Sequence, residues 1–171
     1  WEGGMSFHGA LIGVIVGTYL FSKKIKINTF FFLDIVACVA PIGIFLGRIA
    51  NFINSELYGK PSNFFWSVIF PKIDMVGRHP SQLYEAFLEG FILFSILIIT
   101  ILKKNIRVGV CSSLFLILYG IFRIFAEQFR EPDVQIGHLF NLYSMGSFLS
   151  FIMLLAGLFI FVKIKSYETF K

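Results

Sequence analysis

The sequence predicts an all-α fold, a polytopic bundle of transmembrane helices in a single domain (residues 1–171). Of its residues, 57% are hydrophobic and only 15% are charged, whereas a soluble domain carries about 25% charged residues. The apolar runs are as long as the roughly 20 residues that a helix needs to cross a bilayer. The charges gather in short stretches between these runs. Together, these observations indicate membrane spans joined by loops.

The apolar runs define about five spanning helices. They are expected near residues 6–22, 29–53, 80–102, 108–127 and 139–162. Both cysteines, Cys38 and Cys111, fall inside apolar runs, so each is expected to be a small buried hydrophobic side chain. No spacing of cysteine and histidine suggests a metal site, and no cofactor is expected.

Positive charge in three short stretches predicts the orientation of the bundle. Residues 23–28 hold three lysines, residues 103–107 hold two lysines and an arginine, and residues 163–171 hold three lysines against one glutamate. With five spans these stretches fall on one side, which the positive-inside rule makes cytoplasmic. The loops 54–79 and 128–138 then face outward. We therefore interpret the net charge of +5 as a topology signal rather than a nucleic-acid-binding surface.

Polar side chains gather at the outward ends of four predicted helices. They are His8 in the first helix, Arg48, Asn51, Asn54 and Glu56 at the end of the second, Gln82 and Glu85 in the third, and Arg123 and Glu127 in the fourth. Ionisable groups inside a membrane are unfavourable and usually functional. A ring of them at one depth predicts one shared polar cavity.

Helical spacing places these polar groups on one face of each helix. At about 100° per residue, each stripe spans about 60°. The stripes comprise Arg48, Asn51 and Ser55; Gln82, Glu85 and Glu89; and Arg123, Glu127 and Arg130. Unsatisfied polar groups facing lipid are strongly unfavourable, so each stripe is expected to face inward.

Two arginines at one depth indicate an anionic ligand. A guanidinium group stays charged and binds phosphate through two parallel hydrogen bonds, and phosphate at headgroup depth belongs to a phospholipid. Glu127 lies four residues after Arg123, where it could orient that arginine or neutralise it until substrate arrives. Simpler alternatives remain open: Arg48 as an interfacial anchor, and Arg123 with Glu127 as a structural ion pair.

The remaining polar residues have competing interpretations. His8 is the candidate for proton transfer, whereas His79 is expected to be a turn or cap residue and His138 an interfacial one. Asn51 and Asn54 could instead form hydrogen bonds between helices. Two further residues have their own interpretations: Asp34, far from the other groups, as structural, and Gly59, with Pro61 after it, as part of a turn.

Five segments carry a family resemblance. Residues 47–59, GRIANFINSELYG, fit the pattern G-R-x-x-N-F-x-N-x-E-x-x-G. The segments MSFHG (5–9), RHPSQLYE (78–85), YGIFRIFAEQFREPD (119–133) and YSMGS (143–147) accompany it in order. Together they resemble the prolipoprotein diacylglyceryl transferases, over essentially the whole chain. Two departures are Ala10 in place of a glycine and Ser147 in place of a glutamine. Because family members have seven spans, the resemblance implies an N-terminally truncated chain with two spans before Trp1.

The resemblance implies an enzyme of bacterial lipoprotein maturation. It would move the diacylglyceryl group of phosphatidylglycerol to the lipobox cysteine thiol of a prelipoprotein, forming a thioether and releasing glycerol phosphate. The implied place is the bacterial plasma (inner) membrane, with the site toward the periplasmic face. The implied catalytic residues are His8, Arg48, Arg123 and Glu127. The residues implied to bind the headgroup are Arg48, Asn51, Asn54, Glu56, Gly59, Tyr119 and Arg130.

The competing class is a phospholipid or anion transporter, or a binding protein, without covalent chemistry. A polar cavity with two arginines near one face fits that class too. The predicted depth favours the enzyme, because the groups lie near the headgroups whereas transporter sites usually lie near the midplane.

Overall fold

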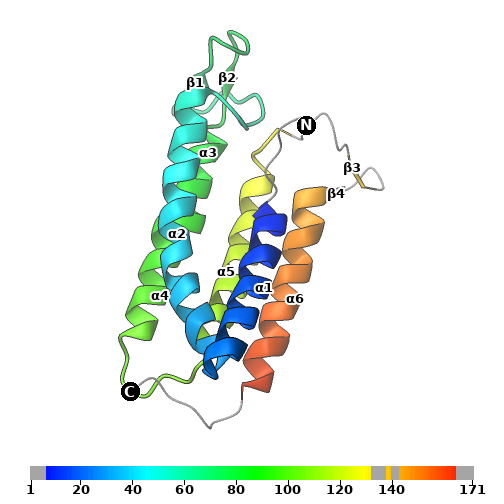
Figure 1. Cartoon of the computed structure of the whole chain (residues 1–171). Coiled ribbons are helices and arrows are strands. Elements are labelled where there is room, and N and C mark those ends of the chain that lie inside the picture. The colour runs from blue at the N-terminus through cyan, green and yellow to red at the C-terminus, as the bar shows by residue number, and fades with distance from the viewer. Residues whose placement is uncertain (1–6, 132–137, 140–142, 165–171) are drawn as a thin grey trace.

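The computed structural model describes residues 7–131, 138–139 and 143–164. In this part of the chain, helices run along one common direction, with short strands in the connections at one end (Figure 1). The helices are α1 (Phe7–Ile25), α2 (Thr29–Asn54), α3 (Ser81–Glu85), the π-helix η1 (Ala86–Ile92), α4 (Leu93–Ile101), α5 (Val110–Glu127) and α6 (Met145–Lys163). The strands are β1 (Val68–Ile69), β2 (Gly77–Arg78), β3 (His138–Leu139) and β4 (Tyr143–Ser144).

The bundle has two sides. On one side α2 packs along the continuous helix formed by α3, η1 and α4, and on the other α5 packs against α6 (Figure 1). The two sides meet where α2 contacts α5, and α1 packs on α2. This arrangement brings α2, η1 and α5 together around one shared interior.

The predicted helix bundle is confirmed, because each of the five expected helices is present. Four are long and apolar enough to cross a membrane: Thr29–Asn54, Ser81–Ile101, Val110–Glu127 and Met145–Lys163. The remaining helix, α1, has 19 residues and carries Lys23 and Lys24 in its last turn. That α1 also spans the membrane stays a prediction.

One predicted boundary is wrong. The last helix was expected to begin at residue 139, but α6 begins at Met145. The residues before it form an antiparallel strand pair, with His138 opposite Ser144 and Leu139 opposite Tyr143. Hydrophobic pattern alone does not separate a short apolar strand from the start of an apolar helix.

The third predicted span contains a π-helical segment that sequence pattern did not reveal. Its i→i+5 hydrogen bonds insert an irregularity into an otherwise α-helical span, a feature often found at functional sites. Here α2 approaches closely, because a Cβ added at Gly90 would lie 2.6 Å from Phe45 Cβ and 2.9 Å from Phe45 Cα. The segment also contains Glu89, which is fully buried.

The two ends of the bundle differ in charge. The connections after α1 and α4, with their lysines, lie at the end opposite the loop of residues 55–80 (Figure 1). That loop carries both signs, including Lys60, Lys72, Asp74 and Arg78. The predicted separation between a positive end and a mixed end is therefore present in the fold.

A buried apolar cluster in the bundle includes both cysteines. Cys38 and Cys111 are buried beside Leu93, Leu97 and Phe115. Their thiols lie 3.8 Å and 4.0 Å from the carbonyl oxygen of Leu97. The prediction that both are small buried side chains is confirmed.

Candidate functional site

Six charged side chains meet where α2, α3, η1 and α5 come together, near the end of the bundle that carries the loop 55–80. We call this group the Arg–Glu cluster. Its members are Arg48, Glu85, Glu89, Arg123, Glu127 and Arg130. The predicted gathering of polar stripes from three helices is therefore present.

Glu85, the last residue of α3, lies at the centre of the cluster. Its Oε2 atom is 2.7 Å from Arg48 Nη1 and 2.9 Å from Arg123 Nη1. Its Oε1 atom is 3.6 Å from Arg130 Nη1. Glu85 thus contacts the three arginines of the cluster, and its side chain is fully buried.

Glu89 lies four residues further along the same helix and contacts two of these arginines. Arg48 Nη2 donates a hydrogen bond to Glu89 Oε2 at 3.2 Å, and Arg123 Nη1 lies 3.7 Å from Glu89 Oε1. The close packing of Gly90 on Phe45 brings η1 near enough to α2 for these contacts. Arg48 and Arg123, from two different helices, are therefore held by the same two carboxylates.

Glu127 occupies the edge of the cluster. Its Oε2 atom lies 2.7 Å from Arg123 Nη2, so the predicted pairing of these two residues is confirmed. The side chain is 13% exposed, whereas Glu85 and Glu89 are fully buried. Glu127 also lies against the start of α6, because a Cβ at Gly146 would be 3.2 Å from Glu127 Oε1.

The formal charge of the cluster is zero, because three arginines face three glutamates. Buried charges are tolerated only when they are paired in this way. Within the described residues, Arg123 Nη1 has no hydrogen-bond acceptor aligned with it, although Glu85 and Glu89 are near. The oxygens of Glu85 also keep unmet hydrogen-bonding capacity there. The site therefore has polar atoms with which a further ligand could form hydrogen bonds.

Tyr119 and Arg130 complete the surroundings of the cluster. Tyr119, on α5, is buried within electrostatic reach of Arg48, Arg123 and Glu89. Arg130, just beyond α5, is buried and reaches Glu85. Both were predicted to bind a headgroup, and the fold places both beside the two central arginines.

The other polar residues of the GRIANFINSELYG segment lie at the C-terminal end of α2. Asn51 is partly buried, and its carbonyl oxygen accepts a hydrogen bond from Glu56 N at 2.9 Å. The side chains of Asn54 and Glu56 are exposed. The carbonyl oxygen of Glu56 accepts a hydrogen bond from the buried Gln82 at 2.7 Å. The fold therefore does not bring the Asn54 and Glu56 side chains into the cluster.

Gly59 lies in extended backbone, so the predicted turn at Gly59 and Pro61 is wrong. Gly59 forms an isolated β-bridge with Arg130, and Pro61 forms one with Arg78. A Cβ at Gly59 would lie 2.2 Å from the carbonyl oxygen of His79 and 2.8 Å from that of Phe129. The glycine is needed for close approach of three backbone segments rather than for reversing the chain.

Arg78 fastens the loop 55–80 to the end of α5. It contacts Asp74 Oδ2 at 2.6 Å, Glu131 Oε2 at 3.3 Å and the carbonyl oxygen of Gly59 at 3.1 Å. The hydrogen bond from Arg78 lowers the pKa of Asp74, and the same bond raises the pKa of Arg78. Both groups therefore stay charged near neutral pH. They hold the loop at the end of the bundle that contains the Arg–Glu cluster.

Of the three histidines, His79 is the one whose side chain the structure describes. His79 is buried just before α3, where its Nδ1 lies 3.1 Å from the Tyr84 hydroxyl and its carbonyl oxygen accepts from Gly59 N. His79 was predicted to be a turn or cap residue, but the N-cap of α3 is Pro80 and the His79 ring contacts Tyr84 instead. The backbones of His8 and His138 lie at the starts of α1 and β3, but their side chains are outside the described part of the structure.

Sequence reasoning missed two members of the cluster, Glu85 and Glu89. The spacing of Gln82, Glu85 and Glu89 placed them on one stripe, yet neither glutamate was counted as a site residue. The available signal was the predicted depth, which matches that of Arg48 and Arg123. Among the described residues, no group of three histidine, cysteine, aspartate or glutamate side chains is arranged to hold a metal ion.

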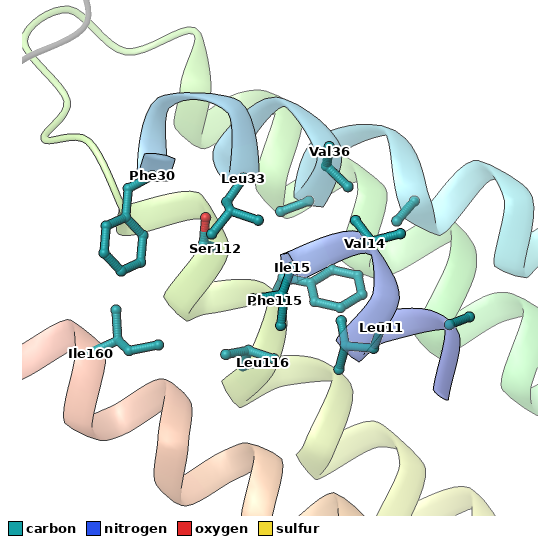
Figure 2. Close-up of a pocket in the computed structure, with 13 residues that line it drawn as sticks. Leu11, Val14, Ile15, Phe30, Leu33, Val36, Ser112, Phe115, Leu116 and Ile160 are labelled. Carbon is teal, nitrogen blue, oxygen red and sulfur yellow. The ribbon is translucent and has the colours of Figure 1, made fainter. Parts of the chain in front are cut away.

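An apolar cavity of about 300 Å³ lies apart from the cluster. Figure 2 shows side chains of α1, α2, α5 and α6 converging on it, among them Leu11, Leu33, Phe115 and Ile160. Among the described residues that line it, Ser112 is the one polar residue, and its hydroxyl donates to Asp34. The described lining of the cavity suits apolar groups.

The fold and the cluster define a class: a polytopic membrane protein with a buried, charge-balanced arginine–glutamate site near one end of its bundle. Residues 1–163 match the family described as prolipoprotein diacylglyceryl transferase. The chain belongs to this family.

Relatives named phosphatidylglycerol–prolipoprotein diacylglyceryl transferase cover nearly the whole chain. A protein of Rickettsia bellii (strain OSU 85-389) is 54% identical over 95% of this chain and 63% of its own length. One of Rickettsia typhi is 52% identical over 97% and 65%, and one of Rickettsia felis is 55% identical over 92% and 61%. The chain thus spans less than two thirds of the length of these relatives.

Proposed function

We propose that this chain belongs to an enzyme that transfers the diacylglyceryl group of phosphatidylglycerol to the lipobox cysteine of a prelipoprotein. One observation carries the proposal: Arg48 and Arg123, from α2 and α5, meet on the buried Glu85 in a member of this family. Two guanidinium groups at that depth suit the phosphate of a lipid headgroup. The names of the relatives state the same donor and acceptor.

The reaction needs no nucleophile from the enzyme. The substrate cysteine, as a thiolate, attacks the glyceryl carbon that carries the phosphate. A C–S bond forms and the C–O bond breaks, with its electron pair leaving on the oxygen of glycerol phosphate. The thiol proton goes to a base, for which His8 is the candidate. The product is a thioether.

Arg48 and Arg123 would act as a phosphate clamp. Negative charge grows on the leaving phosphate as the C–O bond breaks, and fixed positive groups in a water-poor site stabilise that charge. Glu127 would hold Arg123 in place from the edge of the cluster, where it is the least buried of the three carboxylates. Because the cluster is neutral before substrate arrives, phosphate must compete with carboxylates for the arginines.

The remaining candidates would contact the headgroup or shape its site. Tyr119 and Arg130 are buried beside the clamp, and Asn51 lies one helical turn beyond Arg48. Asn54 and Glu56, which are exposed at the end of α2, would meet the headgroup from the outer side. Gly59 would act indirectly, because it lets the loop 55–80 lie against Phe129 and Arg130.

The proposed place is the plasma membrane, with the lysine-bearing end of the bundle in the cytoplasm. The positive-inside rule supports this orientation. The Arg–Glu cluster and the loops 54–79 and 128–138 would then lie toward the outer face, where the acceptor cysteine of a translocated prelipoprotein would be reached.

The test uses membranes that contain the full-length gene product, phosphatidylglycerol and a lipobox peptide. Mass spectrometry should find peptide that has gained one diacylglyceryl group, and none when serine replaces the peptide's cysteine. Folded protein that binds the phospholipid but leaves the peptide mass unchanged would contradict the proposal. That result would favour a phospholipid or anion transporter or binding protein.

A further inference from the structure

We infer that Glu85 is a positioning residue for the proposed transfer: it fixes the phosphate-binding arginines relative to each other. The inference rests on the proposed function. It adds a positioning role that depends on the negative charge of Glu85 and on the length of its side chain. Glu85 would act through Arg48 and Arg123, without touching the reacting atoms.

The first argument is geometric. Arg48 and Arg123 belong to helices that are far apart in sequence, yet both place Nη1 within 2.9 Å of one atom, Glu85 Oε2. A single oxygen that two guanidinium groups share keeps their two Nη1 atoms close to each other. The other oxygen of Glu85 reaches Arg130 at 3.6 Å.

Glu85 is better suited to this role than the other two glutamates. Glu127 contacts Arg123 and is partly exposed, so it can move aside for a ligand. Glu89 contacts the same two arginines as Glu85, but at 3.2 Å and 3.7 Å, longer than the contacts of Glu85. Glu85 is fully buried at the end of α3 and has the shortest contacts to the pair.

The second argument is electrostatic. The carboxylate of Glu85 attracts the same guanidinium groups that would bind the phosphodiester, so it competes with the substrate for them. Its removal changes the formal charge of the cluster from zero to +1, and an anionic lipid should then bind more tightly. The arginines would lose the carboxylate that pairs with both of them at the same time, so the reaction should slow even though binding improves.

A structural role alone predicts a different pattern. Loss of a buried charge that only holds helices together lowers the amount of folded protein, while the sites that remain folded keep their KM and kcat. Asp34 provides the matched control, because it is also a fully buried carboxylate but caps α5 at the opposite end of the bundle. The two carboxylates can be neutralised by the same chemical change.

The experiment compares Glu85→Gln with Asp34→Asn in the full-length protein, with rates divided by the amount of folded enzyme. For Glu85→Gln we expect KM for phosphatidylglycerol to fall by about threefold or more. We expect kcat to fall by about tenfold to a hundredfold. Direct binding of phosphatidylglycerol to the protein in detergent should tighten in parallel. For Asp34→Asn we expect unchanged KM, kcat and lipid affinity.

Glu85→Asp is the second variant, because it keeps the charge but withdraws the carboxylate by one methylene. It should lower kcat without any gain in lipid affinity. The inference is overturned if Glu85→Gln leaves KM and kcat unchanged. It is also overturned if Glu85→Gln, like Asp34→Asn, lowers only the amount of folded protein. Failure of both Glu85 variants to fold, when Asp34→Asn folds, would make Glu85 structural and overturn it as well.

The same assay separates this inference from the proposed function. If the wild-type protein transfers no diacylglyceryl group, the proposed function fails. The affinity of Glu85→Gln for phosphatidylglycerol still decides whether Glu85 restrains a phosphate-binding pair of arginines. If the wild type is active and the lipid affinity of Glu85→Gln does not rise, only the inference about Glu85 fails.

Discussion

Asp34 accepts two hydrogen bonds from Ser112, one from the backbone nitrogen at 2.7 Å and one from the hydroxyl at 2.5 Å. A third comes from the nitrogen of Gly109 at 2.6 Å. Asp34 belongs to α2, whereas Ser112 lies in the first turn of α5. A side chain of one helix therefore caps another, and its negative charge also suits the positive end of the α5 dipole.

Replacing Asp34 with asparagine should destabilise the protein. An amide keeps one acceptor but turns an NH₂ group toward a backbone donor of α5, which leaves that buried donor unsatisfied. We expect the free energy of unfolding to fall by about 1–3 kcal/mol, measured by denaturation in detergent. Ser112→Ala, which keeps the backbone bond, should cost about 1 kcal/mol. Unchanged stability in Asp34→Asn would contradict the capping role.

Gly59→Ala should displace the loop 55–80. The new methyl group would meet backbone atoms of His79 and Phe129 at 2.2 Å and 2.8 Å, and backbone cannot move aside as a flexible side chain can. We expect faster proteolysis of the loop and a strong loss of transfer activity. Gly43→Ala is the control, because a Cβ there meets no atom within 4 Å. Equal protease resistance in the two variants would refute this prediction.

Gly90→Ala should separate η1 from α2. The added methyl would lie 2.6 Å from Phe45 Cβ and 2.9 Å from Phe45 Cα, and overpacking of this kind typically costs about 1–3 kcal/mol. Because Glu85 and Glu89 precede Gly90 in the same continuous helix and contact Arg48 on α2, transfer activity should fall beyond the loss of folded protein. Activity per folded molecule is the measurement, and a value equal to that of the wild type would show that the cluster tolerates the shift.

Arg48→Lys and Arg123→Lys should each cut transfer sharply while they preserve charge. Lysine supplies one ammonium group, whereas each arginine here uses two nitrogens: Arg48 contacts Glu85 and Glu89, and Arg123 contacts Glu85 and Glu127. We expect a loss of about tenfold to a thousandfold in kcat/KM in membranes with matched protein levels. Wild-type activity in both lysine variants would remove the phosphate clamp from the mechanism.

Much of the fold was predictable because a membrane span has a simple signature. Apolar runs bounded by charges placed α2, the Ser81–Ile101 helix and α5 within a few residues of their ends. The strand pair before α6 was not predictable, because hydrophobic pattern alone does not separate a short strand from the start of an adjoining apolar helix. The π-helical segment was also hidden, because no local sequence signal marks it.

Part of the candidate site was predictable from the sequence: Arg48, Arg123, Glu127 and one pairing, but not the central place of Glu85. Spacing of three and four residues placed Arg48, Arg123 and Glu127 on inward faces at one depth, and the pairing of Arg123 with Glu127 followed from local helix geometry. The contacts of Glu85 join three segments, so they depend on how far each helix is rotated and how deep it sits. Local spacing carries no information about either quantity.

By itself, the sequence determined the class of protein, the approximate spans, the charge difference between the two ends and the residue types available for binding phosphate. These properties depend on composition and local periodicity, which hold for any packing of the helices. Only the tertiary structure decided that Arg48 and Arg123 share Glu85, that the cluster is neutral, and that Asp34 caps a helix 75 residues away at Gly109. Those facts depend on distances between segments remote in sequence, which arise only when the helices pack.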